Sequence, residues 1–165
     1  MKLSQVLLAE VNQEAKATRA LLAAVPFDKA DFKPHEKSMS LKHLATHVAE
    51  ISGWWKECLV QDELDFAKGD YTPKVFNSTD DILALHDKHI VQADKILNEV
   101  SETEFEKPWT MRSGEAIYFT MPKSQVVRTW CMNHLYHHRA QLGVYLRLLD
   151  VPLPGTYGPT ADVQG

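Results

Sequence analysis

The sequence has 165 residues, enough for one domain that buries about two thirds of the surface of its unfolded chain. Its formal net charge is −4 and it has no run of Lys or Arg, which argues against nucleic acid or an anionic membrane as a partner. No stretch of about 18 consecutive apolar residues occurs, so we expect no membrane span. With two cysteines and no secretion signal, we expect a cytoplasmic protein with free thiols.

Apolar residues recur with helical spacing in four segments, which polar, Pro- and Gly-containing stretches separate. The first predicted helix covers about residues 3–24 and ends before Pro26. The second covers about residues 40–60 and begins at Ser40, a residue type that commonly caps helices. Each helix carries an apolar stripe and must therefore bury one face.

The third predicted helix covers about residues 79–100 and follows Ser78, which opens a sequence typical of a capping box. The fourth covers about residues 122–149, with Pro122 at a position where proline is favoured. Four long amphipathic helices in one chain predict an all-α protein, a four-helix bundle.

The segments outside these helices suggest no second domain, so we expect a single domain over residues 1–165. Between the third and fourth helices, WTMRSGEAIYFTM places a Ser-Gly pair between residues that favour strands, which predicts a short hairpin or an irregular crossover. The tail, residues 150–165, is rich in Pro and Gly and is expected to fold back over the bundle.

The main chemical feature is the segment NHLYHHRAQL, which contains three histidines. On a helix, His134 and His138 lie one turn and about 40° apart, so both should point into the bundle. His137 falls about 60° to one side of His134. The second helix sends His47 inward as well, with His43 one turn earlier. Two helices therefore direct imidazoles toward the interior.

Three buried imidazoles need partners, because an unpaired polar group costs roughly 1–3 kcal/mol. Each could bond to a carboxylate, a carbonyl or water. Alternatively, three imidazole nitrogens could bind one divalent ion at about 2.0–2.1 Å, and the combination of a pair with a third histidine from another helix favours this. Imidazole ligands favour zinc, nickel or related ions over magnesium and calcium. Three ligands would leave at least one open coordination position, as in catalytic sites.

Three motifs stand out along the chain: His47-Val48-Ala49-Glu50 followed by Trp54-Trp55, His134-x-x-x-His138-Arg139-x-Gln141, and Tyr157-Gly158-Pro159-Thr160-Ala161-Asp162. Together they resemble the motifs of the DinB (damage-inducible) family. The resemblance spans nearly the whole chain and implies a helical bundle in which His47, His134 and His138 hold a divalent metal. Ala140 departs from the family motif, which usually has Gly there. The resemblance assigns no role to the two other nearby histidines, His43 and His137.

The resemblance also implies a reaction. Family members of known activity include metal-dependent transferases and isomerases that use bacillithiol or mycothiol, so we expect a thiol S-transferase that joins an external thiol to an electrophilic substrate. One alternative is a hydrolase that uses metal-bound hydroxide, with Glu50 as a candidate base or as a surface carboxylate. Another is a metal-binding stress-response module without turnover. A homodimer through apolar helix faces is expected for such a bundle.

Several other residues have simpler interpretations. Cys131 is near His134 in sequence, but burial as a small apolar residue is the expectation. Arg139 should form a salt bridge or a contact between helices rather than bind substrate. Four aromatic residues could line a pocket near the metal, although core packing is expected for each: Trp54, Trp55, Trp130 and Tyr145. Three histidines are expected to be exposed: His35, His86 and His89.

Overall fold

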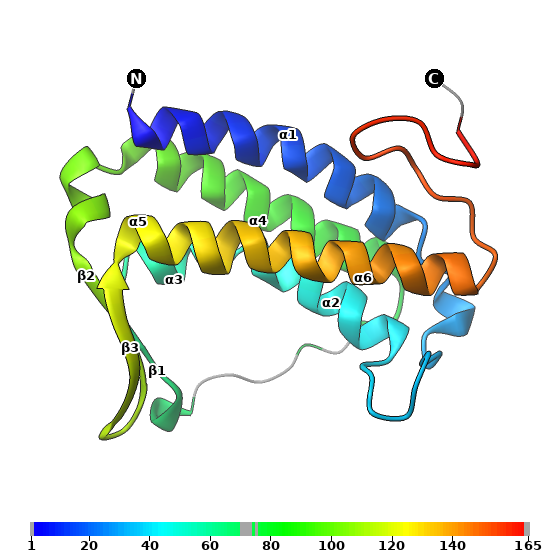
Figure 1. The fold of residues 1–165 in the computed structure, drawn as a ribbon, viewed down its shortest axis with the longest axis horizontal. Coiled ribbons are helices and arrows are strands. Elements are labelled where there is room, and N and C mark those ends of the chain that lie inside the picture. The colour runs from blue at the N-terminus through cyan, green and yellow to red at the C-terminus, as the bar shows by residue number, and fades with distance from the viewer. Residues whose placement is uncertain (1, 70–73, 75, 164–165) are drawn as a thin grey trace.

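The computed structural model describes residues 2–69, 74 and 76–163. Four helices, here called the helical body, lie alongside one another (Figure 1): α1 (Leu3–Ala23), α2 (Leu41–Ile51), α4 (Thr79–Glu99) and α6 (His134–Leu148). Shorter elements connect them: α3 (Trp54–Leu59), α5 (Lys123–Val126), the π-helical segment η4 (Val127–Asn133), and the 3₁₀ turns η1 (Phe27–Lys29), η2 (Phe66–Lys68) and η3 (Glu102–Glu106). The chain therefore has a helix-rich fold.

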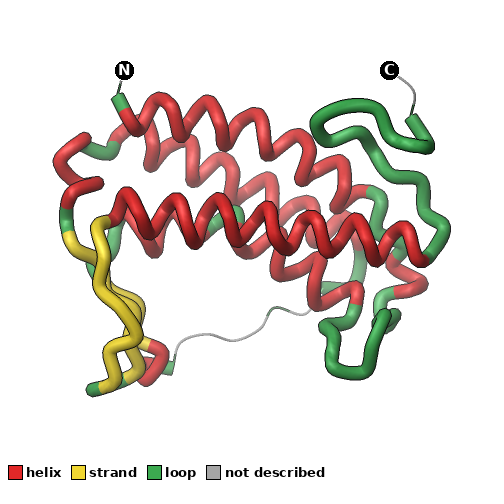
Figure 2. Tube along the Cα trace, viewed as in Figure 1, coloured by secondary structure: helices red, strands yellow, loops and turns green. Residues whose placement is uncertain are grey.

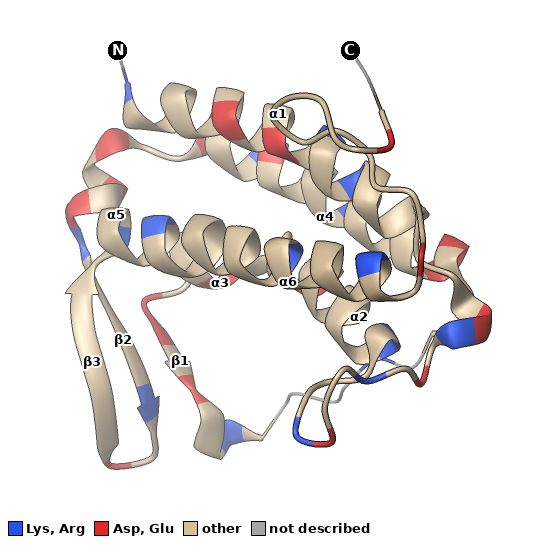
Figure 3. Ribbon diagram, turned by 45° about the vertical axis from the view of Figure 1, so that its right-hand side comes forward, with Lys and Arg blue, Asp and Glu red and all other residues tan. Residues whose placement is uncertain are grey.

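Charged residues of both signs are distributed over the helical body and the connecting elements (Figure 3). No helix in the described part of the chain is long and apolar enough to cross a membrane.

Serine caps fix the start of two helices, as the sequence predicts. The Ser40 Oγ accepts a hydrogen bond from the His43 backbone N–H at 3.2 Å, and the Ser78 Oγ accepts one from the Asp81 N–H at 3.1 Å. The Asp81 carboxylate accepts from the Asn77 N–H at 3.1 Å. Such caps satisfy backbone donors that lack a partner in the helix and contribute about 1 kcal/mol each. The cap at Ser40 thereby fixes the start of α2, which carries His47.

Two clusters of buried apolar side chains fill the helical body. The first joins the C-terminal half of α1 to α2, the start of α4 and α6, and includes Leu22, Leu44 and Leu142. The second joins the N-terminal half of α1 to α3, the end of α4, β2 and η4, and includes Trp55 and Trp109. The clusters place α2 and α6 against each other, the two helices that carry the site.

A small three-stranded sheet accompanies the helices, so the all-α prediction is right only in part: the fold is helix-rich. β1 (Glu63–Asp65) pairs in parallel with β2 (Pro108–Ser113), which pairs antiparallel with β3 (Ala116–Pro122). The sheet extends from one end of the helical body (Figure 2). The β2–β3 hairpin confirms the predicted hairpin, and Gly114 in its turn has a φ of +58°, which favours glycine. β1 is too short for its three residues to show an alternating pattern.

Two helices that the sequence predicts as continuous are interrupted. The second is divided after Ile51 into α2 and α3. The fourth consists of α5, the π-helical η4 and α6 in succession. A π-helix uses i→i+5 hydrogen bonds, so it shifts the face on which later residues lie relative to earlier ones. An apolar repeat of 3.6 residues contains no information about either interruption.

Two histidines of α4 differ from the expected exposure. His86 is buried at 1% exposure, and its Nδ1 lies 3.3 Å from the Asp87 carboxylate. Burial lowers the pKa of His86, so its imidazole is neutral at pH 7. His89 is half-buried, and its Nδ1 donates to the Ala49 backbone carbonyl of α2 at 2.9 Å. Exposure was expected from the polar neighbours of both histidines in the sequence, which do not show which face of α4 is covered.

Gly53 allows α4 to approach the junction of α2 and α3. A Cβ added at Gly53 would lie 2.7–2.8 Å from three ring atoms of His89. This separation is shorter than a non-bonded contact between carbon atoms allows. The absence of a side chain at this position is therefore a packing requirement.

We expect Gly53→Ala to lower the free energy of unfolding by about 1–3 kcal/mol, because the His89 ring must move out of its packed position. Gly143→Ala on α6 is the matched control, since a Cβ there meets nothing within 4 Å. Alanine is favoured over glycine inside a helix by roughly 0.5–1 kcal/mol, so the control should be slightly stabilised. Urea unfolding measures both. Equal stability of Gly53→Ala and the parent would show that His89 moves without cost.

The chain after α6 folds back over α1 and α6 (Figure 1). The Tyr157 hydroxyl donates to the Glu14 carboxylate at 2.8 Å and accepts from the Arg139 guanidinium. Arg139 and Glu14, both buried, form an ion pair at 2.6 Å, as the sequence analysis expects for Arg139. These contacts join α1, α6 and the tail.

Candidate metal centre

The structure brings His47 of α2 together with His134 and His138 of α6. The Nε2 of His134 lies 3.3 Å from the Nε2 of His47 and 3.0 Å from the Nε2 of His138. Candidate ligand atoms of all three lie within 4.8 Å of one another, and in the described ranges no other group of three His, Cys, Asp or Glu meets this condition. These are the three histidines that the sequence selects, and their role as metal ligands stays a prediction.

Two of the nitrogen separations fit a bound divalent ion. Ligand nitrogens at about 2.0–2.1 Å from one ion lie about 2.8–3.4 Å apart when the angles at the ion are about 90–110°. The two Nε2 separations of 3.0 and 3.3 Å fall within this range. A proton on the His134 Nε2 can be directed at only one of its two neighbours, which leaves another pair of nitrogens facing each other. A divalent cation would satisfy all three lone pairs.

A hydrogen bond fixes the tautomer of His138. Its Nδ1 donates to the Gln141 Oε1 at 2.7 Å, so the Nε2 that faces His134 carries a lone pair. A histidine that binds a metal through one ring nitrogen commonly donates its other ring N–H to a nearby oxygen in this way. The sequence motif contains Gln141, but its role was not predicted, because helical spacing alone does not show which atoms meet.

The three histidines lie at the edge of the core, and the prediction that His134 and His138 point into the bundle is only partly right. His138 is 9% exposed, whereas His47 and His134 are half-buried. The face of α6 that enters the core is centred on Leu142 and Leu146, both at 0% exposure. Two apolar residues of the same helix are exposed: Val144 and Leu148. The ligand face is therefore rotated toward the surface, where an external molecule can reach it.

All three imidazoles are neutral at pH 7. Burial, together with the nearby imidazoles that would repel a positive charge, lowers the pKa of His47 to about 4. Burial likewise lowers the pKa of His134 to about 4, against a raising contribution from the Trp130 backbone carbonyl. Burial also lowers the pKa of His138, although the bond to Gln141 opposes this. Neutral imidazoles have the lone pairs that a metal requires.

The metal-free protein is expected to lose stability as the pH falls from about 6.5 to about 4. The folded-state pKa of His47 and of His134 is about 4, whereas the ordinary value is 6.5. In this window the unfolded chain binds protons that the folded chain does not, so the free energy of unfolding increases with pH and levels off above about 6.5. Urea unfolding of chelator-treated protein should show a steeper pH dependence than that of a His47→Asn, His134→Asn double variant. An equal pH dependence of the free energy of unfolding in the two proteins would contradict the lowered pKa values of His47 and His134.

Aromatic rings cover one side of the histidine group. Trp54 and Trp130 stack with ring centroids 6.1 Å apart, and Phe119 of β3 stacks on the other side of Trp130 at 5.8 Å. The ring of Trp54 lies 5.2 Å from that of His134. Four aromatic residues were considered as the lining of a pocket near the metal. Trp54 and Trp130 are at the site, whereas Trp55 and Tyr145 are buried in the core. Phe119 was not predicted.

The remaining candidates lie outside the group. His137 is exposed and its ring is 4.8 Å from that of His138, while His43 is exposed one turn before His47. Glu50 is half-buried on α2; burial lowers the pKa of His89, and the charge of Glu50 is among the contributions that oppose this shift. None of these side chains belongs to the three-histidine group in the described part of the chain.

Neither cysteine is placed to act as a nucleophile. Cys58 and Cys131 are both buried at 1% exposure, and neither is in a disulfide. Burial raises the pKa of the Cys131 thiol well above its ordinary value, and the contact with Cys58 raises it further. Because the thiolate is the reactive form, Cys131 is inert at neutral pH. This matches the expectation that Cys131 is a small buried residue.

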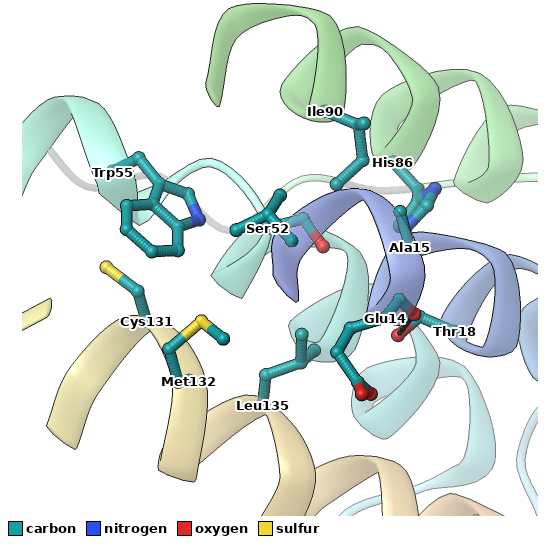
Figure 4. A pocket seen from close by; sticks show the side chains of 11 residues that line it. Glu14, Ala15, Thr18, Ser52, Trp55, His86, Ile90, Cys131, Met132 and Leu135 are labelled. Atoms are coloured by element: carbon teal, nitrogen blue, oxygen red, sulfur yellow. Dashed lines mark hydrogen bonds between the residues drawn. The ribbon is translucent and has the colours of Figure 1, made fainter. Parts of the chain in front are cut away.

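A separate interior cavity lies between α1, α4 and η4 (Figure 4). Its volume is about 10 Å³, and Glu14, Ser52, His86 and Cys131 contribute to its lining. This volume is close to the minimum for one water molecule. The cavity is too small for a substrate, so the histidine group is the stronger candidate site.

The fold is helix-rich, and three histidines converge at the surface of α2 and α6. These two features indicate a class of helical proteins with a candidate metal centre. The family model of the DinB family matches residues 1–163, so the chain belongs to the DinB family. No match was found among the curated proteins.

Solved structures with a similar fold include two DinB-like proteins. That of Bacillus subtilis has a TM-score of 0.68 and 17% identity, over 90% of this chain and 95% of that chain. That of Bacillus cereus ATCC 10987 has a TM-score of 0.64 and 19% identity, over 91% of this chain and 95% of that chain. At these identities the likeness supports the fold alone.

Proposed function

We propose that this DinB-family protein is a metal-dependent thiol S-transferase whose divalent zinc or nickel ion is held by His47, His134 and His138. The observation that carries the proposal is the convergence of three neutral imidazoles, in which the Nε2 atoms of His47 and His138 lie 3.3 and 3.0 Å from that of His134. An ion held by three imidazoles has an open coordination position, where it lowers the pKa of a bound thiol or water. The four-helix bundle of α1, α2, α4 and α6 would hold the two ligand-bearing helices together.

The chain's own residues support an external thiol as the nucleophile. Cys58 and Cys131 are both buried, and burial raises the pKa of the Cys131 thiol, so neither is placed to supply the attacking sulfur. The half-buried position of His47 and His134 leaves the group reachable from solvent. Trp54 and Trp130 shield one side of His134 from water. A low-molecular-weight thiol of the bacillithiol or mycothiol type and a small electrophile are the proposed substrates.

The test is thiol conjugation by protein loaded with zinc or nickel. Loss of free thiol is measured against a panel of electrophiles that includes 1-chloro-2,4-dinitrobenzene, with metal-stripped protein as the control. We expect conjugation above the uncatalysed rate only in the loaded protein. A loaded protein that conjugates no thiol to any electrophile of the panel would refute the transferase proposal.

The same assay separates the alternatives. A hydrolase would cleave ester or amide substrates without added thiol, and a binding module without turnover would show neither activity. Homodimerisation and a cytoplasmic location remain predictions, of which the first is tested by sedimentation of the purified protein.

A further inference from the structure

Gln141 is an exposed residue of α6 with one specific contact. Its Oε1 accepts from the His138 Nδ1 at 2.7 Å, three residues earlier on the same helix. Residues three apart face each other along a helix, so the contact needs no help from another element. It orients the His138 ring so that its Nε2 lies 3.0 Å from the Nε2 of His134.

The residue at this position also sets the charge of the site. The group that could hold an ion in the described part of the chain consists of three imidazoles and no carboxylate. Gln141 adds a neutral amide, whereas a carboxylate is a frequent partner of ligand histidines elsewhere. With neutral ligands and a neutral partner, both positive charges of a divalent ion remain uncompensated. This charge favours an anionic molecule at the open position.

We propose that Gln141 is a positioning residue that directs the His138 Nε2 toward the ion and, because it is neutral, keeps the open position favourable to an anionic donor such as a thiolate. The inference rests on the proposed function, since it requires the metal to be bound. Beyond the proposed function, the inference states the charge of the external ligand and names the residue that determines it.

Cobalt(II) titration tests both parts, because the visible absorption of the ion reports its binding and its ligands. Azide is the anionic probe. We expect Gln141→Leu to weaken cobalt binding about 10–100-fold, as for other outer-shell partners of ligand histidines. Gln141→Glu should restore cobalt binding, since its carboxylate can accept the same hydrogen bond, but should weaken azide binding about 10-fold. The matched control is Gln125→Glu, an equal charge change at an exposed residue of α5, which should alter neither.

Each part has its own contrary outcome. Unchanged cobalt affinity in Gln141→Leu would overturn the positioning role. Equal azide affinity in Gln141→Glu and the parent, or equal weakening in Gln125→Glu, would overturn the charge selectivity. A parent protein that binds no cobalt would instead refute the proposed metal site itself. Circular dichroism of each variant confirms that the helical fold is retained.

Discussion

Replacing His134 with alanine is expected to abolish tight metal binding, with an affinity loss above about 100-fold, the upper range for loss of an outer-shell partner. The reason is geometric, because the His134 Nε2 is the atom that both other Nε2 atoms face. Without it, His47 and His138 provide only two nitrogens. Metal content per chain, measured by mass spectrometry, and affinity from competition with a chromogenic chelator give the result.

His137→Ala is the matched control for that substitution. His137 is exposed, three residues from His134, and outside the three-histidine group. Its removal should leave metal content unchanged. Loss of metal in His137→Ala would mean that the wrong neighbour was selected, and full occupancy in His134→Ala would show that the site lies elsewhere.

The second large effect is expected at Arg139. Arg139→Ala should lower the free energy of unfolding by about 3–5 kcal/mol, because it leaves the buried Glu14 carboxylate without its cation. Arg139 is 4% exposed and Glu14 is 7% exposed, so water cannot replace the lost partner easily. Arg139 also donates to the Thr18 Oγ1 at 3.1 Å and to the Tyr157 hydroxyl, so the tail should loosen as well. Urea unfolding of metal-free protein measures the change.

Arg19→Ala provides the comparison at the surface. Arg19 pairs with Asp87 at 2.9 Å, but the two side chains are 51% and 46% exposed. Exposed pairs contribute about 0–1 kcal/mol, so this variant should remain close to the parent. Similar losses of unfolding free energy in the two variants would show that burial does not increase the contribution of the Arg139–Glu14 pair.

Features determined by local sequence could be predicted, and features determined by tertiary contacts could not. Ser40 and Ser78 cap helices through atoms three residues away, and the β2–β3 hairpin depends on its own turn. The π-helical η4 and the parallel pairing of β1 depend on packing that no short window of sequence contains. Exposed Leu148 and buried His86 show the same limit, since apolar and polar residue types did not determine which helix face was covered.

The candidate site follows the same division. His134 and His138 are neighbours because of helical geometry alone, whereas the choice of His47 used its position on the inner side of another helix together with the family resemblance. Phe119 reaches the site from β3, so only the folded hairpin shows that it stacks on Trp130. The role assigned to Gln141 required the distance between two side-chain atoms.

X-ray absorption spectroscopy of protein purified without added metal tests the central claim most directly, because it identifies both the ion and its ligand atoms. We expect a divalent ion with three imidazole nitrogens at about 2.0–2.1 Å and an additional light ligand at the open position. A sulfur ligand at about 2.3 Å from a protein cysteine, or a protein that contains no metal and takes up none, would contradict this claim.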